Sequence, residues 1–200
     1  MNKQVFFSAV KKTLFGGKLT QSQVSGMDSI LDSFELNGVT DNRYRAYMLA
    51  TVYHECAKKM QPIEEYGGKA YFTKRYGIEG SNRKLAISLG NMNVGDGYKY
   101  AGRGYVQCTG RSNYKKMGEL LGVNLVDFPE LALNPIIASK IMIEGMTRGI
   151  FTGKKLSDYF NEGKTDWVNA RRIINGMDKA DLIAGYALKF FDALKDANDN

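Results

Sequence analysis

The recurrence of apolar residues at helical spacing along most of the chain is the feature that most constrains its fold. Residues 24–34 show the pattern clearly, with Val24, Met27, Ile30, Leu31 and Phe34 on one face. Such stripes predict helices over residues 5–15, 24–34, 42–60, 112–121, 135–146, 156–160, 167–174 and 178–194. We therefore expect an all-α, mainly helical protein.

Start and stop signals support these helices. Thr20 followed by Gln23 is a helix start signal, and Asp41 or Asn42 can cap the helix that follows. Pro135 suits the first turn of a helix, and Asn175-Gly176 is a good helix stop.

The helical pattern breaks down over residues 62–101, where glycines and tyrosines replace the apolar stripe. A long irregular stretch within a compact chain is usually functional. No linker or repeat divides the chain. We expect one domain over 1–200, in which 62–101 forms a small lobe or irregular insertion.

The formal net charge of +7 favours polyanionic partners, which include nucleic acids, anionic lipids and acidic wall polymers. Lys and Arg are scattered in ones and twos, without a basic arm, so we expect no nucleic-acid site. Two nucleotide motifs are absent. Residues 149–155 lack the spacing of a phosphate loop, and Gln107 stands where the third glycine of a dinucleotide fingerprint belongs.

Neither export nor membrane insertion is expected. No stretch approaches the roughly 18 uninterrupted apolar residues of a membrane span, and the N-terminal apolar patch is too short for a secretory signal. We expect synthesis in a cytoplasm, with Cys56 and Cys108 as thiols. Because the chain has one histidine, a histidine-rich zinc site is disfavoured, and we expect neither metal nor cofactor.

Two segments carry candidate acid–base chemistry. Glu55 continues the apolar face of the 42–60 helix, where desolvation favours the protonated form that a general acid needs. Glu64 follows Pro62 in an expected loop, where it would stay ionised as a base. Glycoside hydrolysis needs such a pair of carboxyl groups. In the alternative interpretation, Glu55 caps a helix or pairs with an inner arginine, and Glu64 and Glu65 are solvated charges.

The stretch 102–114 combines polar side chains with glycines and contains few apolar residues. Gln107, Thr109 and Asn113 could hydrogen-bond a sugar or hold a water molecule, while the glycines let a ligand approach the backbone. Alternatively, this stretch is a tight turn that leads into a helix.

These segments together resemble the glycoside hydrolase family 19 lysozymes and chitinases, specifically the phage endolysin branch. The resemblance runs from about residue 3 to 194. It rests on matches that occur in the family's order: His54-Glu55, Glu64 nine positions on, Gly95-Asp96-Gly97-Tyr98, the string 102–114, Pro129-Glu130-Leu131-Ala132 and Ile174-Asn175-Gly176.

The resemblance implies a lysozyme-like, two-lobed fold with a cleft between the lobes, a single catalytic domain over 1–200, and 62–101 lining the cleft. It also implies an inverting, metal-free hydrolase. Glu55 would be the general acid, Glu64 the base and Thr109 a residue that holds the water. The residues expected along the sugar subsites are His54, Arg103, Tyr105, Gln107, Asn113 and Asn175.

The chain departs from the family pattern at both carboxyl groups. Cys56-Ala57-Lys58 replaces the usual Thr or Ser followed by two glycines, and Glu65 stands where Asn is common, which makes Glu65 the reserve candidate for the base. Cys108 replaces an aliphatic residue. Both cysteines are expected beside the cleft, where oxidation could impair activity.

The expected function is that of a phage-type endolysin, which cuts the β-1,4 bonds between N-acetylmuramic acid and N-acetylglucosamine of bacterial peptidoglycan and so lyses the host cell. Partners would be peptidoglycan and an anionic outer-membrane surface, and the protein would be a monomer. It would wait in the host cytoplasm until a holin releases it to the periplasm and cell wall. The alternatives are a chitinase and a non-catalytic glycan-binding protein, while a zinc amidase or peptidase is disfavoured.

Overall fold

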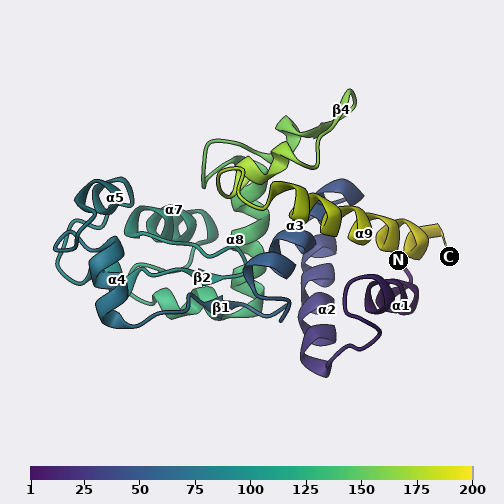
Figure 1. Ribbon diagram of the computed structural model, residues 1–200, viewed down its shortest axis with the longest axis horizontal. Coiled ribbons are helices and arrows are strands. Elements are labelled where there is room, and N and C mark those ends of the chain that lie inside the picture. Colours follow the sequence, from purple (N-terminus) through teal and green to yellow (C-terminus); the bar gives the residue numbers. More distant parts are fainter. Residues whose placement is uncertain (200) are drawn as a thin grey trace. The chain divides into compact units, whose positions relative to one another are not determined.

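The computed structural model describes residues 1–199, which form a mainly helical protein (Figure 1). The chain divides into two compact units, which are described separately. Unit 1 comprises residues 1–61 together with the chain from residue 142 on, and unit 2 comprises Pro62–Ile141. The prediction of an all-α fold is confirmed.

Unit 1 contains four long helices, which are α1 (Lys3–Thr13), α2 (Gln21–Leu36), α3 (Asn42–Glu55) and α9 (Ala180–Asp199). Helix α8 (Pro135–Arg148) begins in unit 2 and ends in unit 1. Between α8 and α9 lie short elements, namely η2 (Leu156–Asp158), the hairpin of β3 (Phe160–Asn161) with β4 (Lys164–Thr165), and η3 (Asn169–Ile173). Among residues 1–199, no helix is long and apolar enough to cross a membrane.

Helix α3 is the centre of unit 1. Every residue from Arg45 to Tyr53 is buried, because α2 packs on one part of its surface and α9 on another (Figure 1). Tyr53 packs edge-on against Tyr186 of α9, with ring centroids 4.7 Å apart, and its hydroxyl donates to the Leu14 carbonyl at 2.6 Å. A helix held from several sides gives its last residue, Glu55, a fixed position.

The turn after α3 packs against α2. Three of its residues, Ala57, Lys58 and Met60, adopt positive φ, which is uncommon outside glycine. Gly26 of α2 allows the approach, because a Cβ there would lie 1.8 Å from the Met60 carbonyl oxygen. Gln23 donates from Nε2 to the Lys58 carbonyl at 3.1 Å and so ties the turn to α2.

Unit 2 contains α4 (Lys69–Tyr76), α5 (Arg83–Ser88), α6 (Asp96–Lys99), α7 (Arg111–Leu121) and η1 (Pro129–Leu133). Strand β1 (Ile63–Glu64) pairs antiparallel with β2 (Arg103–Gly104), which sets Glu64 opposite Arg103. Gly104 adopts φ +89°, and a Cβ there would lie 2.9 Å from the Ala132 carbonyl oxygen of η1. The pairing therefore joins the two segments that carry unit 2's candidate site residues.

Several sequence predictions hold. Thr20 and Gln23 form a capping box, Asp41 caps α3, and α7 and α8 occupy the predicted stretches. Three predictions are wrong in detail. The third helix ends at Glu55 instead of about residue 60, because the backbone turns into positive φ there. Residues 62–101 contain three short helices, and the segments 156–160 and 167–174 contain 3₁₀ turns in place of α-helices.

Candidate functional site

Glu55 is the last residue of α3, and its side chain is 19% exposed. The Oε1 atom accepts a hydrogen bond of 2.7 Å from Nη1 of Arg171, whose own side chain is 4% exposed. Arg171 lies on η3 and also donates from Nε to the Asp178 carbonyl at 3.1 Å. The alternative expectation of a pairing with an inner arginine is therefore correct in its geometry.

Glu55 stands at the C-terminal end of α3, partly buried, with the guanidinium of Arg171 on its Oε1 atom. An arginine at this distance makes a charge-assisted hydrogen bond to a carboxylate, which is stronger and more directional than a bond between neutral groups.

His54 and Asn175 also lie in unit 1. His54 is half-buried, and desolvation holds its pKa below the ordinary value, although the charge of Glu55 opposes this shift. The imidazole is therefore neutral at pH 7, as a hydrogen-bonding group beside an acid. Asn175 follows η3, is exposed, and accepts a hydrogen bond of 2.9 Å from the amide of Gly176.

The adjacent carboxyl groups of unit 2, on the last residue of β1 and on the residue that follows it, have different partners. Glu64 is 47% exposed and pairs with Arg103, with Oε1 2.6 Å from Nη2. Glu65 accepts a hydrogen bond of 2.9 Å at Oε1 from the Tyr76 hydroxyl, and one of 3.3 Å at Oε2 from the Gly102 amide. One carboxylate is thus neutralised by a cation, and the other is held by neutral donors.

Three side-chain oxygens converge on Gly102. A Cβ on that glycine would lie 3.0 Å from Oε2 of Glu65, 3.1 Å from Oε1 of Gln107 and 3.1 Å from Oγ1 of Thr109. These atoms come from residues that are up to 44 positions apart in the sequence. We refer to Glu65, Gln107 and Thr109 as the oxygen cluster. A carboxylate beside amide and hydroxyl oxygens can orient a water molecule and accept its proton.

Local hydrogen bonds fix the oxygen cluster. Gln107 adopts φ +55°, and its Nε2 donates to the carbonyls of Ile63 at 3.1 Å and Gly104 at 3.0 Å. This directs Oε1 toward Gly102. Thr109 donates from Oγ1 to the Gln107 carbonyl at 2.8 Å. Asn113 donates from Nδ2 to the Thr109 carbonyl at 2.8 Å, so it supports the loop from α7.

Two of the predicted sugar-binding residues are buried. Tyr105 is 0% exposed, and its ring is part of the core, while its role in sugar binding stays a prediction. Arg103 is 8% exposed; besides its bond to Glu64, its Nη1 donates to the Lys99 carbonyl and the Tyr114 hydroxyl. Arg103 thereby connects β2 to α6 and α7.

Both cysteines are buried thiols. Burial raises the pKa of Cys108 to about 12, so almost none of it is the reactive thiolate at neutral pH. The effect of cysteine oxidation on activity stays a prediction.

Sequence analysis missed Arg171, the buried cation at Glu55. The sequence contains Arg171-Arg172 in a stretch expected to be helical, and only the fold turns the first of the two inward. In the described part of the chain, no group of three His, Cys, Asp or Glu side chains is arranged to hold a metal ion.

A family model described as chitinase class I, glycoside hydrolase family 19, matches residues 27–148, more than half of the chain. The fold resembles that of chitinase C from Streptomyces griseus HUT6037, with a TM-score of 0.58, 19% identity, and coverage of 98% of this chain and 76% of that one. A bacterial family 19 chitinase gives a TM-score of 0.61, 21% identity, and coverage of 96% and 94%. No curated protein matches.

Proposed function

The chain belongs to glycoside hydrolase family 19, and on that premise we propose that it cuts the β-1,4 bonds between N-acetylmuramic acid and N-acetylglucosamine in bacterial peptidoglycan. The protein is a glycoside hydrolase. The observation that carries the proposed chemistry is the oxygen cluster, in which a carboxylate held by neutral donors meets an amide and a hydroxyl oxygen at Gly102.

The general acid in this proposal is Glu55. Its proton passes to the glycosidic oxygen as the bond to the anomeric carbon breaks, and the leaving sugar departs as a neutral hydroxyl. Arg171 then stabilises the new carboxylate through the 2.7 Å bond to Oε1. In this mechanism Arg171 acts after proton transfer, because the negative charge on Glu55 forms only at that step.

We assign the base to Glu65 instead of Glu64, to which sequence analysis gave the role. The Glu64 carboxylate is already engaged by the guanidinium of Arg103, with Oε1 2.6 Å from Nη2. Glu65 accepts hydrogen bonds from the Tyr76 hydroxyl and the Gly102 amide, and its Oε2 lies at Gly102 together with oxygens of Gln107 and Thr109. Its carboxylate takes a proton from water while the water oxygen bonds to the anomeric carbon, which inverts the configuration.

Peptidoglycan is favoured as substrate by charge. The net charge of +7 promotes approach to anionic cell walls and outer-membrane surfaces, with a strength that falls as salt rises. Within the proposal, the protein is a phage-type endolysin that stays in the host cytoplasm until a holin opens the membrane. It then acts on the wall, as a monomer, and lyses the cell.

Chitin is the second candidate substrate, because solved structures with a similar fold are chitinases. Chitin and peptidoglycan both contain β-1,4-linked N-acetylglucosamine, so the acid and base suit either polymer. The two substrates differ in the lactyl group and peptide stem that only peptidoglycan carries.

Mass spectrometry of digests tests the proposal. Wild type and the variants Glu55→Gln and Glu65→Gln are incubated separately with purified peptidoglycan and with chitin oligosaccharides. We expect wild type to release disaccharide muropeptides with reducing N-acetylmuramic ends, and both variants to lose about 10²-fold or more in rate. Glu162→Gln and Glu130→Gln, at exposed glutamates in unit 1 and unit 2, are the matched controls and should retain full activity.

The outcomes separate the possibilities. Cleavage of chitin alone would show that the substrate is chitin instead of peptidoglycan, with the acid–base mechanism unchanged. Cleavage of peptide stems, or normal turnover by Glu55→Gln, would overturn the mechanism. Binding of glycan without cleavage by wild type would support the glycan-binding alternative.

A further inference from the structure

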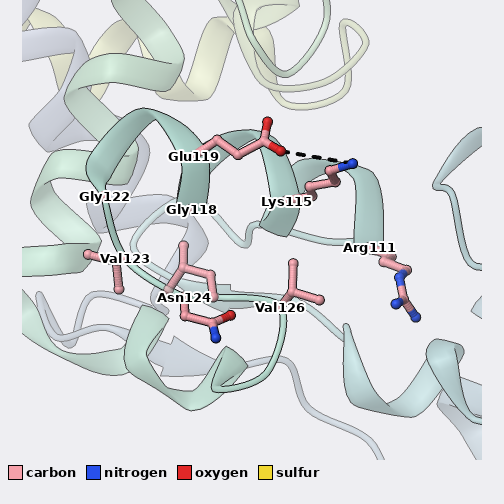
Figure 2. A pocket seen from close by; sticks show the side chains of 9 residues that line it. Arg111, Lys115, Gly118, Glu119, Gly122, Val123, Asn124 and Val126 are labelled. Carbon is pink, nitrogen blue, oxygen red and sulfur yellow. Dashed lines mark ion pairs between the residues drawn. The ribbon is translucent and has the colours of Figure 1, made fainter.

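A cavity of about 490 Å³ runs along one face of α7 in unit 2 (Figure 2). One wall comes from Arg111, Lys115 and Gly118, whose spacing of three or four residues places them on the same side of α7, and from Gly122, which follows the end of the helix. Figure 2 shows the other wall, which is the chain that follows α7 and includes Val123, Asn124 and Val126. We refer to this cavity as the α7 groove.

Two cations stand on the helical wall. Arg111 donates from Nη1 to Asp96 at 3.1 Å, and its side chain remains 38% exposed. Lys115 is 65% exposed, and its Nζ lies 3.9 Å from the equally exposed Glu119, a loose pair at the limit of an ion contact (Figure 2). Lys115 can therefore exchange Glu119 for a carboxylate of a ligand at little cost.

The opposite wall is mostly apolar. Val123 and Val126 are partly exposed in the groove, while Leu125 is buried beneath them. The two walls come close together at Gly118, since this residue has no Cβ and one there would lie 2.6 Å from the Val123 carbonyl oxygen. A ligand that suits this groove combines carboxylates on one side with small apolar groups, such as methyl groups, on the other.

The groove is long enough for a short peptide. From Arg111 to Leu121 the helix rises roughly 15 Å, at about 1.5 Å per residue. An extended peptide of four or five residues spans a similar length, about 14–17 Å. The groove also begins two residues after Thr109, which belongs to the oxygen cluster.

We propose that the α7 groove binds the peptide stem of peptidoglycan, with Arg111 and Lys115 contacting its carboxylates and the valines contacting its alanine methyl groups. The inference rests on the proposed function and deepens it, because chitin has no stem. It makes unit 2 responsible for selecting peptidoglycan as well as for activating water.

Lys115→Glu tests the groove, with Lys116→Glu as the matched control. Both lysines are exposed on α7, and only Lys115 lines the groove. Arg111 is unsuitable, since its loss would leave the buried Asp96 without its cation. The substrates are intact peptidoglycan and the same glycan strands after an amidase has removed the stems.

On intact peptidoglycan, we expect Lys115→Glu to raise KM about threefold to tenfold with little change in kcat, as for loss of an exposed ion pair with charge reversal. On stripped strands the change should be less than about twofold. Lys116→Glu should behave as wild type on both substrates. Equal KM values for Lys115→Glu and wild type on intact peptidoglycan would overturn the inference.

A binding measurement separates this inference from the proposed function. The free tetrapeptide L-Ala-D-Glu-diaminopimelate-D-Ala is titrated into ¹⁵N-labelled wild type, and amide shifts are followed. We expect saturable shifts over residues 111–126 that weaken in Lys115→Glu. If wild type cuts peptidoglycan but the peptide causes no shifts there, the inference fails while the proposed function stands. If the shifts occur but only chitin is cut, the proposed function fails.

Discussion

The carboxyl groups of Glu55 and Glu65 are held in contrasting ways in the two units. Glu55 ends a helix that is buried on several sides, and a buried arginine 116 residues away holds one of its oxygens. Glu65 follows a two-residue strand, and its partners are a tyrosine hydroxyl and a glycine amide. A cationic partner suits a group that gains negative charge during reaction, whereas a hydroxyl and an amide orient a carboxylate through hydrogen bonds without forming an ion pair with it.

The same contrast appears between the neighbours Glu64 and Glu65. Their chemical identity is the same, yet Glu64 forms an ion pair with Arg103, whereas Glu65 accepts hydrogen bonds from the Tyr76 hydroxyl and the Gly102 amide. The position of a carboxyl group in the sequence therefore says less about its role than the charge of its tertiary partner.

The largest expected effect separates these two glutamates. Glu65→Gln should lower kcat about 10²–10⁴-fold, because the general base is removed, while Glu64→Gln should lower it less than about tenfold. Initial rates on glycan strands measure both. The reverse order, with Glu64→Gln the more damaging, would return the base role to Glu64 and break the comparison.

The second largest effect is a loss of stability on replacing Arg171, the buried cation beside Glu55 in unit 1. Arg171→Met should lower the free energy of unfolding by about 3 kcal/mol, because it leaves a largely buried carboxylate without its partner. Urea unfolding measures the loss. The adjacent Arg172 is exposed, so Arg172→Met should change stability by less than about 0.5 kcal/mol. A similar loss in both variants would show that burial of Arg171 is unimportant.

A smaller effect on kcat is expected when a methyl group is added at Gly102. Gly102→Ala places a methyl group 3.0–3.1 Å from the three oxygens of the cluster, which must then move by a few tenths of an ångström. We expect kcat to fall about tenfold or more, since small displacements of reacting groups are costly. Gly68→Ala is the control in unit 2, because nothing lies within 4 Å of its new Cβ. Unchanged kcat in Gly102→Ala would argue against the oxygen cluster as the water site.

The smallest effect is the pH dependence of His54. Desolvation lowers the pKa of this group in the folded state below its ordinary 6.5, so the unfolded state binds its proton more readily. The contribution to stability is therefore complete above about pH 6.5 and declines as the pH falls below it. His54→Gln should flatten the decline in urea midpoint between about pH 7.5 and 5. A parallel decline in both proteins would show that protonation of His54 does not destabilise the fold.

Sequence analysis identified the helices with long apolar stripes and their caps, because helical periodicity and capping are local. It failed at the end of α3, where Gly26 lets the turn of residues 56–61 pack against α2. It also failed in residues 62–101, where short helices are held by contacts such as that of Asn91 with the Tyr76 carbonyl. Short elements carry too little periodicity to be recognised without their tertiary partners.

For the site, the sequence determined the residue types and the family. The sequence alone was enough to recognise His54-Glu55, the adjacent glutamates and the string 102–114. Only the tertiary structure decided which of these side chains are buried, and Tyr105 and Arg103 are among them. It also decided which glutamate meets Gln107 and Thr109, and which arginine meets Glu55. The physical reason is that charge partners and burial depend on contacts between distant segments, and local sequence patterns do not encode them.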